Sequence, residues 1–344
     1  MATLYHAASV LLRLIEEVPL HRRTLLTPSM PRALALAAVA LPALASCLRC
    51  AAVAPAVGQS GANALQAIGT VPASPSFVDI PEEELVHRLP ELKKLKPVGS
   101  QDLLPLILRK VGANVAVLFS SFPNVTCREE VTEQRVTAAG AMHDEIYQDF
   151  RYLALAGPDK INVGFKEYRT DSKGRPLQRQ GLDSGYLITE GFVSLPLHFH
   201  PSYQHESTFR YLGQEVIGKQ ATEVVAFAQT PSTHRRERFI ISGDSVSLLT
   251  QGVAWIDAAN NQIVRMRTDL RAPEPEIRLD AQTTRIKFAE VRFKGRSPGL
   301  WLPRDVEVET RCYGIMFRNT HSYSQFKLFS VQTKVAQEAP PSHR

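Results

Sequence analysis

Three histidines near the middle of the chain have the spacing that could most readily support chemistry. His198 and His200 form a His-x-His pair, and His205 follows with Glu206 beside it. On a β-strand, residues i and i+2 share a face, so the two imidazoles would point the same way and could begin a metal site. The sequence therefore allows a metal-binding protein that uses His198, His200 and His205. The alternative is that His200-Pro201 begins a loop and the histidines form hydrogen bonds at a sheet edge.

The motifs of common catalysts are absent from the sequence. It contains no Gly-x-Ser-x-Gly, phosphate loop, dinucleotide fingerprint or His-Glu-x-x-His, and the stretch 243–247 lacks the second glycine of a nucleophile elbow. The main interpretation of His321 and Tyr323 is that they are polar residues on a strand. The second interpretation is that they belong to a functional site. Catalytic groups can also be assembled from distant segments, so this absence favours a non-enzymatic protein without a cofactor but does not prove it.

Four cysteines allow two kinds of covalent chemistry. Cys127 and Cys312 could form a disulfide in an oxidising compartment, and two buried free thiols are the alternative. Cys312 shares strand parity with Val308 and is expected to face inward. Cys47 and Cys50 form a Cys-x-x-Cys, but outside a βαβ context this spacing does not indicate redox or metal chemistry.

An apolar segment near the N-terminus is typical of a secretory signal. Residues 33–45 are uncharged, rich in Ala and Leu, and follow Arg32. This run is too short to span a bilayer comfortably, and the alternative reading is a buried core helix. Signals act at the extreme N-terminus, so we expect Met30 to be the true start. Residues 1–29 would then be a non-native extension and residues 30–56 the signal peptide.

Two modes of cleavage fit the end of this signal. Leu44-Ala45-Ser46-Cys47 fits a lipobox, in which Cys47 would be lipidated and become the first mature residue. Ala45 and Ala56 each also end a small-x-small motif for ordinary signal peptidase. Both modes predict an exported protein of the periplasm or outer membrane. Membrane association is expected only through lipidation at Cys47.

The charge of the chain argues against nucleic acid as a partner. The formal net charge is +6, from 40 basic and 34 acidic residues. Residues 1–56 contain five of the basic and two of the acidic residues, which leaves 35 basic and 32 acidic residues for the rest. Half of the excess therefore belongs to a segment that we expect to be removed. The remainder is too balanced for a nucleic-acid-binding surface.

The first part of the expected mature chain reads as a linker followed by helices. Residues 57–76 are rich in Ala, Pro, Gly and Ser and predict a flexible tether. Residues 77–122 predict a helical segment, because apolar residues recur at helical spacing on both sides of a Pro97–Gly99 break. These stripes are Leu85, Leu89 and Leu92, then Leu103, Ile107, Leu108, Val111, Val115 and Leu118.

From about residue 123 the period of the apolar residues changes to two, which is typical of strands. Residues 253–257 and 262–268 flank a four-residue turn and predict a hairpin. In 285–293 the apolar face changes, which a β-bulge near Ala289 would explain. Residues 223–228 are apolar on both faces, as expected where a helix covers the sheet. We predict an α+β, β-dominated fold, with a curved antiparallel sheet over 123–336, helices toward the N-terminus and a flexible tail over 337–344.

Two stretches resemble outer-membrane lipoprotein-sorting proteins of the LolA/LolB type. The hairpin 253–270 reads Val-Ala-Trp-Ile-Asp-Ala-Ala-Asn-Asn-Gln-Ile-Val-Arg-Met-Arg-Thr-Asp-Leu, and residues 300–306 read Leu-Trp-Leu-Pro-Arg-Asp-Val. The resemblance covers roughly residues 145–333. The chain also resembles a group of uncharacterised secreted acidobacterial proteins in the runs 90–97 and 122–124.

The LolA/LolB resemblance implies a half-open barrel whose mouth is closed by helices, with an apolar cavity that holds acyl chains. A lipid or a lipoprotein is the partner that it implies. On strand parity, the candidates for lining such a cavity are Val163, Phe165, Val225, Phe227, Trp255 and Met266. Core packing is the default expectation for a tryptophan in the aliphatic context of Trp255. The alternative function is an envelope scaffold or interaction module with a filled core and an exposed apolar patch.

Overall fold

The computed structural model describes residues 75–329, except 138–141, 157–164, 172, 176–190, 232–237 and 242–243. The expected extension, signal peptide and tail lie outside the described residues, as do Cys47 and Val163 and nearly all of the expected linker. The predictions made for these segments stay predictions.

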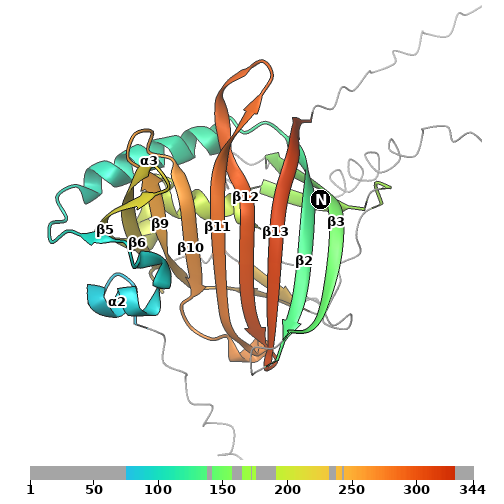
Figure 1. The fold of residues 1–344 in the computed structure, drawn as a ribbon, viewed down its shortest axis with the longest axis horizontal. Coiled ribbons are helices and arrows are strands. Elements are labelled where there is room, and N and C mark those ends of the chain that lie inside the picture. Colours follow the sequence, from blue (N-terminus) through green and yellow to red (C-terminus); the bar gives the residue numbers. More distant parts are fainter. Residues whose placement is uncertain are drawn as a thin grey trace, which may run out of the picture. The chain divides into compact units, whose positions relative to one another are not determined.

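A single antiparallel sheet of eleven strands forms most of the described chain (Figure 1). Its spatial order is β1-β5-β6-β9-β10-β11-β12-β13-β2-β3-β4. In chain order, its strands are β1 (Lys96–Pro97), β2 (Val125–Val136), β3 (Met142–Ala156), β4 (Phe165–Thr170), β5 (Ser207–Ile217), β6 (Gln220–Gln229), β9 (Thr250–Asp257), β10 (Ile263–Leu270), β11 (Leu279–Phe293), β12 (Arg296–Cys312) and β13 (Ile315–Leu328). A separate pair is formed by β7 (Arg238–Ile241) and β8 (Asp244–Ser247).

Within the described residues the helices are few, and the two α-helices precede the long strands of the sheet. They are α2 (Glu82–Arg88) and α3 (Leu104–Ser120). The short 3-10 helices are η1 (Pro90–Leu92), which lies between them, and η3 (Phe192–Phe199), η4 (Gln204–Glu206) and η5 (Pro275–Ile277), which follow later in the chain. The predicted α+β, β-dominated class is confirmed, and so are the antiparallel sheet and the helices in the N-terminal half.

The two faces of the sheet are covered by different segments. We call the face that carries α3 and η3 the inner face, and the opposite face, which carries α2 and η1, the outer face. On β6, Val225 and Phe227 pack toward α3 and η3, whereas Val224 and Ala226 pack toward the leucines of α2 and η1. The stretch 223–228 is therefore apolar on both sides because helical segments cover both sides, as its composition predicted.

The predicted hairpin at 253–268 is present as β9 and β10. Asp257 ends β9, and its Oδ1 accepts hydrogen bonds from the backbone N–H groups of Ala259 (2.7 Å) and Asn260 (3.0 Å). Asn261 then adopts a left-handed conformation with φ 58°, which asparagine tolerates well. The turn thus has a local cause in the Asp-Ala-Ala-Asn-Asn sequence.

The predicted change of face within β11 is also present. Phe288 and Val291 are both buried although they are three residues apart. The register shifts between Lys287, which faces Asp305, and Phe288, which faces Pro303. The pairing skips Arg304 on β12, so an irregularity is present near Ala289, with the extra residue on the partner strand.

The length of α3 explains the curvature of the sheet. Next to its start, the Gln101 side chain exchanges hydrogen bonds with the backbone of Tyr211 on β5. Near its end, the Phe119 ring stacks on Phe165 of β4 at 4.7 Å. β5 and β4 lie nine positions apart in the sheet, which is roughly 43 Å along a flat sheet. A helix of 17 residues is only about 25 Å long, so the edges must bend toward it (Figure 1).

Gly252 on β9 is a point where this packing leaves no room for a side chain. A Cβ there would lie 2.0 Å from the carbonyl oxygen of Arg267 and 2.8 Å from the ring of Phe227. We predict that Gly252→Ala lowers the free energy of unfolding by about 3 kcal/mol, as expected for overpacking of a core. Urea denaturation would measure it. Gly99→Ala is the matched control, because nothing lies within 4 Å of a Cβ there. Equal stability of the two variants would contradict this account.

Candidate functional site

The first half of the inner face is apolar and is covered by η3. Seven of the eight η3 residues are buried, and its large apolar side chains belong to the same cluster as residues of β6, β9 and β10. The Phe199 ring, for example, lies 5.5 Å from that of Phe227. The described residues leave little space here. A hollow between α3, Pro196 and the sheet has a volume of about 20 Å³, close to that of one water molecule.

The predicted cavity residues divide between the two faces. Phe165, Val225, Phe227 and Met266 all belong to the inner apolar cluster. Trp255 belongs to the outer cluster, and its Nε1–H donates to Glu215 at 2.7 Å. The grouping of Trp255 with the inner residues is therefore wrong, because its neighbours along β9 are the ones that face inward. Val225, Phe227 and Met266 lie on β6 and β10, whereas Phe165 lies on the edge strand β4 against Phe119 of α3.

The metal prediction at His198, His200 and His205 is wrong. His198 lies in η3 rather than on a strand, and three residues per turn give i and i+2 different directions. His198 packs its ring 4.7 Å from that of Phe227, the Nδ1 of His200 accepts the Ser202 N–H, and His205 is exposed. No group of three potential metal ligands converges anywhere in the described part of the chain.

The part of the inner face formed by β13, β2 and β4 has a polar centre at Glu129 of β2. We call this part the polar half. Arg169 of β4 donates to both carboxylate oxygens, from Nε at 2.5 Å and from Nη2 at 2.7 Å. From β13, the Oη of Tyr323 donates to Glu129 at 2.8 Å, and the Nδ1 of His321 lies 2.9 Å away. We call these four residues the Glu129 network. All are buried or nearly so, and they come from three strands that were formed from distant parts of the chain.

The charges of this network follow from its burial and its partners. Burial by itself would raise the pKa of Glu129, but Arg169 and His321 outweigh it and lower the pKa to about 2. Burial lowers the pKa of His321 despite the adjacent carboxylate, so the ring is neutral near pH 7. Because the carboxylate can only accept, the Nδ1 of His321 carries the proton. The network is therefore one Glu–Arg ion pair held by two neutral donors.

Tyr152 of β3 lies at the edge of this network. Its ring lies 5.4 Å from that of Tyr323, and the Arg169 guanidinium lies 5.8 Å from its centroid. Its hydroxyl is buried and has no hydrogen-bond partner among the described residues. Burial raises the pKa of Tyr152 well above its ordinary value, so the hydroxyl stays protonated and can donate. Such a hydroxyl is able to donate to a carbonyl oxygen.

Two contacts join η3 to the polar half. The Phe192 ring lies edge-on to His321 at 4.9 Å. The N–H of Gly191, which precedes η3, donates to Glu167 of β4 at 2.8 Å. Sequence reasoning singled out His321 and Tyr323 only as polar strand residues and missed Glu129 and Arg169. Strand parity was the available signal, because Glu129 lies on the same face of β2 as the buried apolar residues of that strand.

The predicted disulfide between Cys127 and Cys312 is wrong, since both are free, buried thiols. Val136 at the end of β2 pairs with Met316 near the β12–β13 turn, close to Cys312. Cys127 is nine residues away along β2, which corresponds to roughly 30 Å of strand. The inward orientation expected for Cys312 is confirmed, and its Sγ lies 3.6 Å from the carbonyl oxygen of Ile277.

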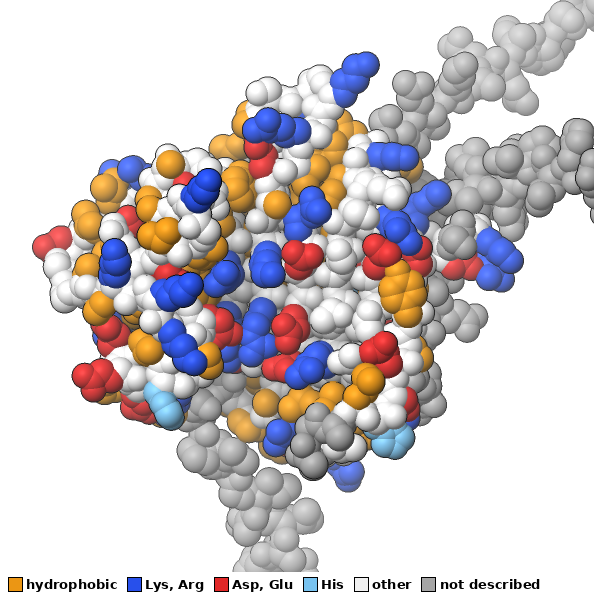
Figure 2. Space-filling model, in the orientation of Figure 1, with side chains coloured by type: hydrophobic (Ala, Val, Ile, Leu, Met, Phe, Trp, Pro, Cys, Tyr) orange, Lys and Arg blue, Asp and Glu red, His pale blue; other side chains and the backbone are white. Residues whose placement is uncertain are grey.

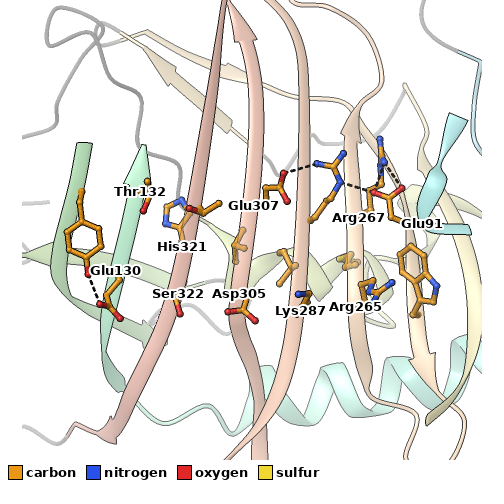
Figure 3. A pocket seen from close by; sticks show the side chains of 17 residues that line it. Glu91, Glu130, Thr132, Arg265, Arg267, Lys287, Asp305, Glu307, His321 and Ser322 are labelled. Carbon is orange, nitrogen blue, oxygen red and sulfur yellow. Dashed lines mark hydrogen bonds and ion pairs between the residues drawn. The ribbon is translucent and has the colours of Figure 1, made fainter. Parts of the chain in front are cut away.

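The outer face carries an open hollow of about 510 Å³ across β10, β11, β12, β13 and β2. Figure 2 shows basic and acidic side chains gathered over the middle of the sheet. Basic residues stand on β10 and β11, and acidic residues stand on β12 and β2 (Figure 3). These groups are Arg265, Arg267, Arg285 and Lys287 on one side, with Asp305, Glu307 and Glu130 on the other. The hollow thus carries basic groups over β10 and β11 and acidic groups over β12 and β2.

Solved structures with a similar course of the chain include three bacterial proteins. A DUF1329 family protein from Desulfovibrio piger has 10% identity and a TM-score of 0.39, over 68% of this chain and 96% of its own. A putative outer membrane lipoprotein-sorting protein domain from Vibrio parahaemolyticus has 12% identity and a TM-score of 0.36, over 67% and 94%. A LolA superfamily protein from Nitrosomonas europaea has 11% identity and a TM-score of 0.33, over 65% and 94%.

These neighbours include the lipoprotein-sorting group that the sequence resembles. At such identities and TM-scores, the likeness says nothing about function. No protein-family model and no curated protein matches the chain. Within the described residues, none of the helices has both the length and the apolar character needed to cross a membrane.

The Glu129 network predicts a loss of stability in acid. Folding lowers the pKa of Glu129 from its ordinary value of 4.5 to about 2, so the unfolded chain binds the proton more tightly. The free energy of unfolding should therefore fall as the pH drops from about 4.5 toward 2, by roughly 3 kcal/mol. His321, whose pKa is also lowered, adds a fall in the same direction below its ordinary value of 6.5. Urea denaturation at a series of pH values from above 6.5 down to 2 would measure both effects.

A substitution tests whether Glu129 causes the fall in the free energy of unfolding between pH 4.5 and 2. Glu129→Gln leaves Arg169 buried without its counter-charge and should cost about 3–5 kcal/mol at pH 7. It should also flatten the profile between pH 4.5 and 2. Glu145→Gln, on the exposed side of the neighbouring strand β3, is the control and should keep the wild-type profile. An unchanged slope in Glu129→Gln would show that another group causes the acid sensitivity.

Proposed function

We propose that this chain is an exported protein of the cell envelope that binds one acyl chain of a lipid or lipoprotein on its inner face, in the place of η3. The observation that supports the proposal is η3 itself. It is an apolar segment that covers the floor formed by Val225, Phe227 and Met266, and it fills a concave face that the sheet has already formed. An acyl chain would contact the same floor after η3 moved.

The secondary structure of η3 makes such a movement inexpensive. A 3-10 helix has weaker hydrogen-bond geometry than an α-helix and rarely exceeds four residues, whereas η3 has eight residues and contains Pro196. It follows Gly191, whose φ of 98° is available mainly to glycine. A few backbone rotations at Gly191 could therefore swing η3 without breaking a long helix.

The energies of the two occupants are similar. η3 buries five large apolar side chains, which are Phe192, Val193, Leu195, Leu197 and Phe199. At about 1.5–3 kcal/mol each, they contribute roughly 8–15 kcal/mol. A 16-carbon acyl chain, at about 0.8 kcal/mol per buried methylene, contributes roughly 12 kcal/mol. Exchange of one for the other is thus nearly balanced, which suits reversible binding.

Hydrogen bonds hold the segments around η3 in place. Asn114 of α3 donates to the carbonyl oxygens of Asn260 (2.8 Å) and Asn261 (2.9 Å) in the β9–β10 turn. Gln204 donates to the carbonyl oxygen of Leu108 in α3 at 2.9 Å. These bonds fix α3 to the sheet and tie the segment after η3 to α3.

The polar half of the inner face would set the orientation of the bound ligand. The Tyr152 hydroxyl is a buried donor without a partner among the described residues, and an ester carbonyl is the acceptor it suits. The hydrocarbon would then lie over Phe227 and Met266, and the ester would lie toward the Glu129 network. The alternative function, an envelope interaction module, is favoured by the exposed Leu103, Leu106 and Val117 on α3.

Binding of a dansyl-labelled fatty acid to the full chain, with palmitate as the competitor, tests the proposal. We expect dansyl emission to rise on binding and palmitate to reverse it. Leu195→Ala weakens the packing of η3 and should tighten binding at least tenfold, since displacement of η3 becomes less costly. If Leu195 instead formed part of a ligand-binding wall, the same substitution would weaken binding.

Val216→Ala is the matched control, because Val216 is an exposed apolar residue on β5 and should leave binding unchanged. Thermal melts would verify that each variant is folded. A folded wild type that binds neither the probe nor palmitate would rule out acyl-chain binding and leave the interaction module.

Export and lipidation are tested by the intact mass of the protein from a bacterial envelope fraction. We expect a mature chain that begins at Cys47 and carries a diacylglyceryl group. Cys47→Ala should abolish the lipid mass and release the chain into the soluble periplasm, with processing after Ala45 or Ala56. Cys50→Ala is the control and should stay lipidated. Recovery of the unprocessed chain from the cytoplasm alone would contradict export.

A further inference from the structure

The outer face carries two consecutive pairs of like charges. In the register of β10 and β11, Arg267 lies directly opposite Arg285, and Arg265 lies directly opposite Lys287. Residues two apart on a strand share a face, so both pairs point into the same hollow, roughly 7 Å apart. Like charges directly opposite each other destabilise a sheet unless an anion lies between them.

The first pair has such an anion within the chain. Glu91 of η1 places Oε1 2.8 Å from the Nη1 of Arg267 and 2.7 Å from the Nε of Arg285, so one carboxylate oxygen bridges both guanidinium groups (Figure 3). Asp269 and Glu309 supply further contacts to the two arginines. This pair is fully neutralised and shows how an oxyanion fits between cations in this register.

In the part of the chain that the structure describes, no carboxylate bridges the two cations of the second pair. Arg265 lies over the Trp255 ring, with its guanidinium carbon 5.4 Å from the centroid. Within the described residues, no ion pair within 4.0 Å joins Arg265 or Lys287 to an acidic group. Asp305 is the register partner of Lys287 on the side away from Arg265 (Figure 3). Glu307 contacts Arg285, and Glu130 accepts a hydrogen bond from Tyr147, so neither serves this pair.

We propose that Arg265 and Lys287 form a binding site for the carboxylate or phosphate group of a ligand that lies in the outer hollow. The ligand oxyanion would bridge the second pair as Glu91 bridges the first. The hollow extends beyond the pair to the hydroxyl side chains Thr320 and Ser322 on β13 and Thr132 on β2. This site lies on the opposite face of the sheet from the proposed acyl-chain site and does not depend on it.

Thermal melting of the full chain tests the site. At equal ionic strength, inorganic phosphate and acetate should raise the melting temperature of the wild type more than chloride does. The double variant Arg265→Gln/Lys287→Gln should lose at least nine-tenths of this specific increase. Without added anion it should melt no lower than the wild type, since the repulsion between the two cations is removed. Lys166→Gln, which removes an exposed cation from β4, is the matched control and should respond as the wild type.

Sedimentation with phosphatidylglycerol vesicles separates the two sources of such an oxyanion. Stabilisation by phosphate or acetate without co-sedimentation assigns the site to a small organic anion. Co-sedimentation that requires Arg265 and Lys287 assigns it to a lipid headgroup. The proposal is overturned if chloride matches the other anions and vesicles do not bind, or if the double variant behaves as the wild type in both assays.

Discussion

The reach of α3 is the constraint on which the rest of the structure depends. A helix of 17 residues contacts strands that lie nine positions apart, so the sheet must curl around it. Curvature of this degree creates a concave face that is too wide for one helix to fill. The chain fills it with η3 on the apolar side and with buried charge on the other side. The character of the inner face follows from the need to fill that space.

Buried charge is a costly way to fill a core, because each ion loses its hydration. The Glu129 network limits this cost by giving the carboxylate four donor groups, from β13 next to β2 and from β4 one strand beyond β3. Arg169 is in register with Tyr152 of β3, so a slip of one residue on β4 would turn it to the outer face. The network therefore helps to fix the register of β3 and β4, together with the packing of Phe165 against Phe119 of α3.

Much of the fold could be predicted because its causes are local. The β9–β10 turn follows from Asp257 and the asparagines after it, and the double-sided apolar stretch of β6 required cover on both faces. The histidine and cysteine predictions failed for a different reason. They assumed strand geometry for His198 and proximity for Cys127 and Cys312, and both depend on which distant segments pack together. Arg169 and Glu129 were missed because their meeting is a property of strand order, which a sequence does not state.

The two faces of the sheet also show how one set of strands can carry two separate chemistries. Side chains alternate along a strand, so the residues next to His321 on β13 belong to the outer hollow while His321 belongs to the inner network. On the outer face, Glu91 comes from a segment 176 residues before Arg267 and attaches the α2–η1 segment to the sheet by charge, next to the leucines that attach it by packing. Stability alone explains the Arg267–Arg285 pair, because Glu91 neutralises it. The second pair differs, because Arg265 lies over the Trp255 ring and Asp305 faces Lys287 from the other side, so no carboxylate within the described residues bridges the two cations. A like-charge pair without a bridging anion is a feature for which function is the better explanation.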